Sequence, residues 1–190
     1  MRAALVLCVL VAGCPPPPMP PEEEHQADRY RRPDLLIPAL GLRPGNHVAD
    51  IGAGGGYLTL RLARAVAPGG RVVATDIDPV ALATLRARAR AAGLEHLIAT
   101  RHVRPDEPGL DGERFDLILL AQVDHLLADR VRYLRALVPA LSPGGRIALC
   151  NAERHRPAAE EAAVRAGLHV REVRAGLPAQ VLLLLLPQDP

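Results

Sequence analysis

The stretch at residues 48–59, V-A-D-I-G-A-G-G-G-Y-L-T, sets a short apolar run and an acid directly before four glycines within five positions. Glycine tolerates positive φ and allows a ligand to approach the main chain closely. An amphipathic segment with helical spacing follows. The order of strand, glycine turn and helix predicts a loop that binds a nucleotide-type cofactor. The competing interpretation is a glycine turn without a ligand.

The spacing of the glycines indicates which cofactor is expected. A dinucleotide fingerprint reads G-x-G-x-x-G/A, and here its third small position holds Tyr57. The motif instead resembles the glycine-rich first motif of class I S-adenosylmethionine-dependent methyltransferases. The resemblance implies that Asp50, Gly52, Gly54 and Gly56 form the loop beside the methionine end of S-adenosylmethionine.

Length and composition narrow the class of protein. A chain of 190 residues with 49% hydrophobic residues supports one globular domain. The net charge of +2 and the aromatic content of 2% argue against nucleic acid as a partner, because neither a basic surface nor stacking platforms are available. All 23 basic residues are arginine, which excludes lysine chemistry.

The N-terminal segment reads as an export signal. Residues 1–13 carry one arginine, an apolar run too short to span a bilayer and a small-residue end. The sequence Val11-Ala12-Gly13-Cys14 resembles the lipobox of bacterial lipoproteins, which implies lipidation of Cys14, a membrane anchor and a location in the cell envelope. An ordinary cleaved signal and a buried apolar helix are the alternatives, and a translation start at Met19 would give a cytoplasmic protein. The proline- and glutamate-rich residues 14–27 predict an extended tether.

The remaining residues, 28–190, alternate between predicted strands and helices. This alternation predicts an α/β fold with a doubly wound, mostly parallel sheet and a ligand at the carboxyl edge of the strands. The closing pair of strands resembles the antiparallel hairpin at the end of class I methyltransferases. We expect strands at residues 47–51, 71–75, 97–103, 115–121, 146–150, 169–174 and 180–186, and helices at 28–41, 58–66, 80–92, 129–141 and 158–166.

Side chains that follow the predicted strands complete the expected cofactor site. Asp76 ends the second strand, where an acid accepts hydrogen bonds from ribose hydroxyls, although it could also cap the next helix. The family resemblance implies that Ile77 lies against the adenine and that Gln122 meets the methionine tail and the substrate. It also implies an acid after the third strand, for which the displaced Asp106 is the candidate.

The pair Asp124-His125 resembles a motif after the fourth strand in the quinone and small-molecule branch of the family. Neutral histidine suits general base catalysis near neutral pH, so His125, with Asp124, is the expected catalytic residue, the alternative being a packing role. The histidines show no paired spacing typical of metal ligands, so no metal is expected.

The sequence thus predicts S-adenosylmethionine-dependent methyl transfer to a small-molecule or lipid-like acceptor. The first alternative is a domain that binds the cofactor without turnover. A nicotinamide-dependent oxidoreductase is the second, and Tyr57 and the missing catalytic Tyr/Lys pair argue against it. The sequence does not specify the acceptor atom or an oligomeric state.

Overall fold

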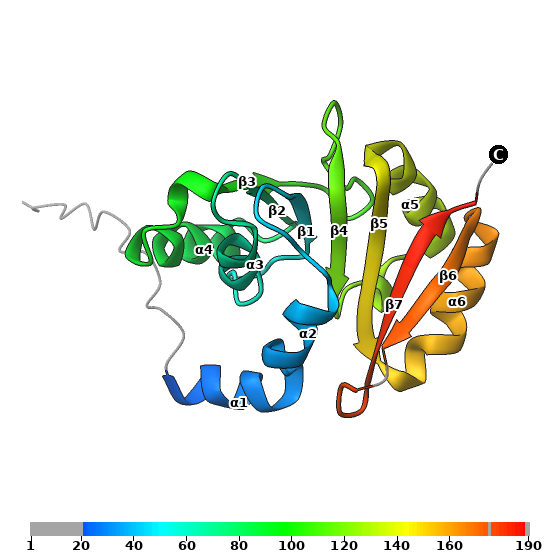
Figure 1. Cartoon of the computed structure of the whole chain (residues 1–190), viewed down its shortest axis with the longest axis horizontal. Helices are drawn as coiled ribbons and strands as arrows, with labels where there is room; N and C mark the ends of the chain where they lie inside the picture. Colours follow the sequence, from blue (N-terminus) through cyan, green and yellow to red (C-terminus); the bar gives the residue numbers. More distant parts are fainter. Residues whose placement is uncertain (1–20, 175, 189–190) are drawn as a thin grey trace, which may run out of the picture.

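Short apolar runs become the strands of a seven-stranded sheet in the computed structural model, which describes residues 21–174 and 176–188 (Figure 1). The strand order is β3-β2-β1-β4-β5-β7-β6, and the first five strands in the sequence run parallel. This confirms the predicted α/β fold with a mostly parallel sheet. The strands are β1 (His47–Ile51), β2 (Arg71–Asp76), β3 (Ile98–His102), β4 (Phe115–Ala121), β5 (Leu141–Ala152), β6 (Leu168–Arg174) and β7 (Gln180–Pro187).

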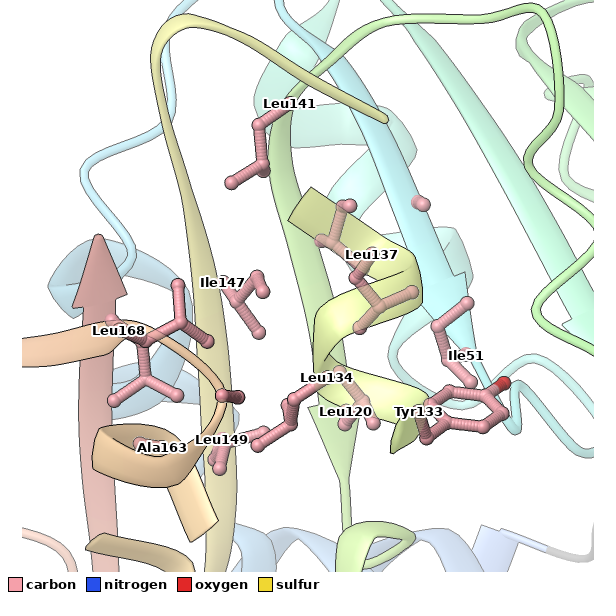
Figure 2. Packing of buried hydrophobic residues seen from close by; sticks show 14 of the residues in the cluster. Ile51, Leu120, Tyr133, Leu134, Leu137, Leu141, Ile147, Leu149, Ala163 and Leu168 are labelled. Atoms are coloured by element: carbon pink, nitrogen blue, oxygen red, sulfur yellow. The ribbon is translucent and has the colours of Figure 1, made fainter. Parts of the chain in front are cut away.

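Both faces of the sheet are covered, because successive side chains of a buried strand point to opposite faces. In β4, Ile118 and Leu120 pack with α5 (Arg130–Leu137) and α6 (Arg156–Arg165), as Figure 2 shows for Leu120 beside Leu134. The alternate residues of β4 pack with α2 (Pro33–Ala39) and α3 (Thr59–Val66) on the other face. The sheet is therefore the centre of a three-layer structure.

The helix α4 (Pro79–Ala91) begins as the sequence predicts. Asp78 precedes it, and its side chain accepts a hydrogen bond from the Val80 N–H at 2.8 Å. Short 3₁₀ turns complete the connections, at Glu95–Leu97, Asp124–Leu126, Val138–Ala140 and Glu153–His155. None of the helices within the described residues is both long and apolar enough to cross a bilayer.

The structure corrects the expectation for the segment before the sheet. Helix α1 (Pro21–Arg31) occupies much of the segment predicted as an extended tether. Proline is tolerated at the first position of a helix and glutamate is a good helix former, so three glutamates after Pro21 favour helix over extended chain. Arg32 has φ 42°, which separates α1 from α2 and divides the single helix predicted over residues 28–41. The predicted signal at residues 1–13 and Cys14 lie outside the described residues.

The second correction concerns the entrance to β5. The helix predicted to reach residue 141 ends as α5 at Leu137. Residues 142–145, which precede the strand predicted at 146–150, already belong to β5, and the pairing with β4 is irregular between Phe115 and Leu117. Gly144 has φ +75°, and a Cβ at Gly145 would lie 2.6 Å from the Phe115 carbonyl oxygen. The bulge thus depends on two glycines that no side chain could replace without strain.

The C-terminal strands follow the prediction. Strand β7 lies between β5 and β6 and is antiparallel to both. Figure 1 shows α1 at the lower left of the view, on the side toward which the arrows of β4 and β5 point, and this is the edge of the sheet where a ligand is expected.

Candidate active site

A cavity of about 440 Å³ opens at the carboxyl edge of β1, β2 and β4, within the range typical of small-molecule sites. Its wall contains the loop after β1, the end of β2 and the segment after β4. It is mostly apolar and carries few polar side chains, which is the usual composition of a pocket that binds and orients a small molecule.

The glycine loop combines packed glycines with an open one. Gly52 (φ +68°) and Gly56 (φ +82°) leave no room for a Cβ, which would lie 2.4 Å from Val123 and 2.2 Å from Leu85, respectively. Gly54 (φ +53°) faces open space and lines the cavity. The structure therefore places Gly52 and Gly54 in the predicted site and gives Gly56, which does not line the cavity, a packing role.

Asp76 is fixed by the backbone of the loop. Its two carboxylate oxygens accept hydrogen bonds from the Gly54 N–H at 2.7 Å and from the Asp78 N–H at 2.9 Å. Asp78 is the N-cap of α4, and Asp76 supports this cap through its bond from the Asp78 N–H while its other oxygen holds the glycine loop. Asp76 lines the cavity beside Ile77, whose side chain is 56% exposed. A preoriented carboxylate next to an exposed apolar side chain suits a ribose diol and its attached base.

Asp50 lies behind the glycine loop instead of in the cavity wall. It is buried, and its carboxylate accepts a hydrogen bond from the Thr59 hydroxyl at 2.6 Å. Burial raises the pKa of Asp50 to about 6, and the Thr59 hydrogen bond only partly offsets this effect. Its contribution to the site is therefore to hold β1 to the start of α3.

Gln122 lines the cavity in a strained conformation. Its φ is +61°, which is unusual for a residue with a side chain, and its N–H donates to the Cys150 carbonyl at 2.8 Å. The Gln122 side-chain amide donates to Gln180 at 2.9 Å, and Gln180 donates in turn to the Tyr30 carbonyl. These bonds link the end of β4 to α1.

Helix α1 forms part of the cavity wall, whereas the sequence analysis assigned residues 14–27 to a tether and gave the helix predicted at residues 28–41 no part in the site. Ala27 and Arg31, one turn apart on α1, line the cavity. Asp28 on the same helix accepts hydrogen bonds from the Tyr57 hydroxyl and, at 2.9 Å, from Arg61. In the sequence, the run of three glutamates after Pro21 is the feature that favours a helix here, and the prediction of a tether did not take their helix propensity into account.

The structure does not bring Asp106 to the cavity. The segment after β3 lines it with Val103, Arg104 and Pro105. The Asp106 side chain is 60% exposed and lies 3.9 Å from Arg104. The acid expected beside the adenine is therefore largely exposed to solvent and lies outside the cavity wall.

Asp124 and His125 also do not line the cavity. The side-chain amide of Asn151 donates to Asp124 at 2.6 Å and to the Nδ1 atom of His125 at 2.8 Å, and Arg130 lies 3.4 Å from the buried Asp124 carboxylate. Because Nδ1 accepts this bond, neutral His125 carries its proton on Nε2. His125 stacks on His155 with ring centroids 4.5 Å apart. The geometry thus favours packing roles over the predicted base.

The residues that replace this pair in the cavity wall are Leu126, Leu127 and Tyr133. Figure 2 shows Tyr133 beside Ile51 with its hydroxyl turned away from the leucines of α5. Burial raises the pKa of Tyr133 to about 12, so the hydroxyl stays protonated at neutral pH. Within residues 21–174 and 176–188, no group of three or more metal-ligating side chains comes together.

Comparison with known proteins identifies the family. A family model described as "Methyltransferase domain" matches residues 49–147, more than half of the chain. The chain is 31% identical over 113 residues to a ubiquinone/menaquinone biosynthesis C-methyltransferase of Vibrio vulnificus, covering 60% of this chain and 44% of the relative. It is 37% identical over 120 residues to a ubiquinone biosynthesis O-methyltransferase of Ruegeria pomeroyi, covering 63% and 44%. It therefore spans less than half the length of these relatives.

Solved structures share the fold. A SAM dependent methyltransferase from Aquifex aeolicus matches with a TM-score of 0.76 at 18% identity, covering 88% of this chain and 98% of that one. The O-methyltransferase NcsB1 from neocarzinostatin biosynthesis, in complex with S-adenosylmethionine and a naphthoic acid, matches with a TM-score of 0.66 at 20% identity, covering 76% and 49%. The glycine loop, the position of Asp76 and the match to the family model all indicate the same class of protein. The chain belongs to the family of S-adenosylmethionine-dependent methyltransferases.

Proposed function

We propose that this protein transfers the methyl group of S-adenosylmethionine to a small-molecule or lipid-like acceptor. The observation that carries the proposal is one continuous cavity with Asp76 and Ile77 in its wall together with the open Gly54 and Gln122. Asp76 would accept hydrogen bonds from the ribose, Ile77 would contact the adenine, and the loop at Gly54 would hold the methionine end.

The chain supplies alignment and a dry environment. S-adenosylmethionine brings an activated methyl group on a sulfonium, and alignment of the acceptor with it can contribute about 7–11 kcal/mol. Val123, Leu126 and Leu127 give the cavity an apolar wall that limits water. The protonated Tyr133 hydroxyl can donate a hydrogen bond to an acceptor oxygen but cannot take up its proton.

The class of acceptor follows from the relatives and the cavity. The relatives' names place them in ubiquinone and menaquinone biosynthesis, and one structural neighbour holds a naphthoic acid. An apolar cavity with few polar groups suits an aromatic acceptor of this kind. The membrane location proposed below would place such a lipid-like molecule within reach.

Calorimetric titration with S-adenosylhomocysteine and S-adenosylmethionine tests the proposal. We expect binding by the wild type and at least about tenfold weaker binding by Asp76→Ala, because a charge-assisted pair with the ribose is lost. Asp106→Ala, which removes an exposed acid outside the cavity, is the matched control. Methyl transfer from labelled S-adenosylmethionine to reduced quinones then measures turnover.

Three outcomes separate the alternatives. Binding without methyl transfer to any acceptor would favour a domain without turnover. Binding of a reduced nicotinamide in place of S-adenosylhomocysteine would favour the oxidoreductase. Equal affinity of wild type and Asp76→Ala would remove Asp76 from the cofactor site.

We further propose that the protein is lipid-anchored in the cell envelope through Cys14. The support is the sequence of residues 11–14 and the apolar run before it, which lie outside the described residues. A start at Met19 is the alternative and would leave the protein in the cytoplasm, where S-adenosylmethionine is made. Mass spectrometry of the mature N-terminus distinguishes the two.

A further inference from the structure

Helix α1 places the charged side chain of Arg31 in the cavity wall from a fixed position. Arg31 lines the cavity one turn after Ala27. The helix is held on both sides, by the bonds of Asp28 to Tyr57 and Arg61 and by the bond from Gln180 to the Tyr30 carbonyl. Since these contacts fix the backbone around it, Arg31 is preoriented toward the cavity.

Among the described residues, Arg31 forms no ion pair, in contrast to the nearby Arg32 and Arg61. Arg32 pairs with Asp34 at 2.6 Å, and Arg61 pairs with Asp28 at 2.9 Å. Within the part of the chain that the structure describes, Arg31 makes no hydrogen bond and no ion pair. A half-buried guanidinium has lost part of its hydration, and its five N–H donors then favour a ligand that replaces water.

The surroundings of Arg31 leave its donors available to a ligand. Its guanidinium lies over the Tyr57 ring, with the guanidinium carbon 5.2 Å from the ring centroid. Its charge also reaches the floor of the site: burial raises the pKa of Asp50, and the Arg31 charge acts in the opposite direction. Asp50 is buried behind the loop and bonded to Thr59, so it does not serve as the partner.

We propose that Arg31 is a recognition residue for a carboxylate bound in the cavity. The planar guanidinium matches a carboxylate with two parallel hydrogen bonds, which a lysine or a neutral donor cannot reproduce. The carboxylate can come from the methionine tail of the cofactor or from an acidic acceptor, and both have the same chemistry at Arg31. This inference rests on the proposed function.

Calorimetric titration of the full-length chain distinguishes the two sources. S-adenosylhomocysteine carries the amino-acid carboxylate, whereas methylthioadenosine keeps the adenosine and lacks it. On the S-adenosylhomocysteine complex, benzoate and the neutral benzamide probe the acceptor side. Arg31→Gln is compared with Arg29→Gln, which removes an exposed arginine from the same helix, and with Arg31→Lys, which keeps the charge.

We expect Arg31→Gln to weaken the binding of one carboxylate probe, S-adenosylhomocysteine or benzoate, by roughly 10- to 100-fold. The affinity for the neutral counterpart, methylthioadenosine or benzamide, should not change. A loss of affinity confined to S-adenosylhomocysteine identifies the cofactor as the source of the carboxylate. A loss confined to benzoate identifies the acceptor as its source. Arg31→Lys should retain part of the affinity, and Arg29→Gln should match the wild type. Melting temperatures should differ by only a few degrees, because Arg31→Gln breaks no ion pair among the described residues and loses only the contact with the Tyr57 ring and a weak interaction with Asp50.

Equal affinities of wild type and Arg31→Gln for all four probes, including undetectable benzoate binding by both, would overturn the inference. The proposed function would survive this result as long as the wild type binds S-adenosylhomocysteine and Asp76→Ala does not. Failure of the wild type to bind either adenosine compound would instead overturn both.

Discussion

At the scale of single residues, the buried carboxylate of Asp50 makes stability depend on pH. Burial raises its pKa from 3.8 to about 6, so the folded protein holds this proton more tightly than the unfolded chain. The stabilising contribution is complete below about pH 3.8 and is lost as the pH rises through about 6. The difference corresponds to roughly 3 kcal/mol, at about 1.4 kcal/mol for each pH unit.

Asp50→Asn should therefore remove this loss between pH 4 and 6, because asparagine is neutral and can still accept the Thr59 hydrogen bond. Urea unfolding across this range measures the free energy of unfolding. Asp106→Asn, an exposed acid, should leave the wild-type pH dependence in place. If the free energy of unfolding changed with pH in the same way for Asp50→Asn and the wild type, the proton on Asp50 would not be linked to folding.

Residues whose role depends on the backbone were predictable from the sequence, and those that depend on packing were not. The glycine loop and Asp76 follow one strand each, so their place at the sheet edge follows from the order of elements. The environment of His125 depends on Asn151, 26 positions away, and on the tautomer that this amide selects. Sequence spacing carries no information about such a contact.

At the scale of elements, the attachment of α1 depends on one buried side chain. Gln180 is 3% exposed and joins Gln122, the residue after β4, to the Tyr30 carbonyl on α1. Gln180→Leu should destabilise the protein by about 1–3 kcal/mol, since it leaves polar groups without partners. The substitution should increase the rate of amide deuterium exchange more in α1 than in β2, because α1 loses a direct hydrogen bond and β2 does not.

Hydrogen exchange read by mass spectrometry, peptide by peptide, checks this expectation. Gln188→Leu makes the same chemical change at an exposed position and should behave as the wild type. Faster exchange spread evenly over α1 and the strands would indicate global destabilisation instead of release of the helix.

The strands and most helices were predictable because their apolar periodicity is strong and Gly or Pro marks their ends. The entrance to β5 was not, because Ser142-Pro143-Gly144-Gly145 has the composition of a turn, and only the pairing with β4 makes it a bulge in a strand. Similarly, α1 has a low apolar content that hides its helical character, and contacts through Asp28 and Tyr30 secure it to the rest of the fold.

At the scale of the whole molecule, the proposed anchor makes a prediction about location. Cys14→Ser should move the protein from the membrane fraction to the soluble fraction and abolish incorporation of a labelled fatty acid. Cys8→Ser, within the predicted signal, is the matched control and should leave both unchanged. An intact protein beginning at Met19 in the soluble fraction would contradict the anchor and support the internal start.

The position of β7 sets the order in which the protein can be completed during synthesis. Strand β7 is synthesised after the other six strands, yet it fills the space between β5 and β6 and buries Leu182 and Leu183 there. Until then β5 has an open, apolar edge and β6 has no neighbour. A chain stalled or truncated before residue 180 therefore exposes an unpaired, apolar sheet edge that favours aggregation until β7 is in place.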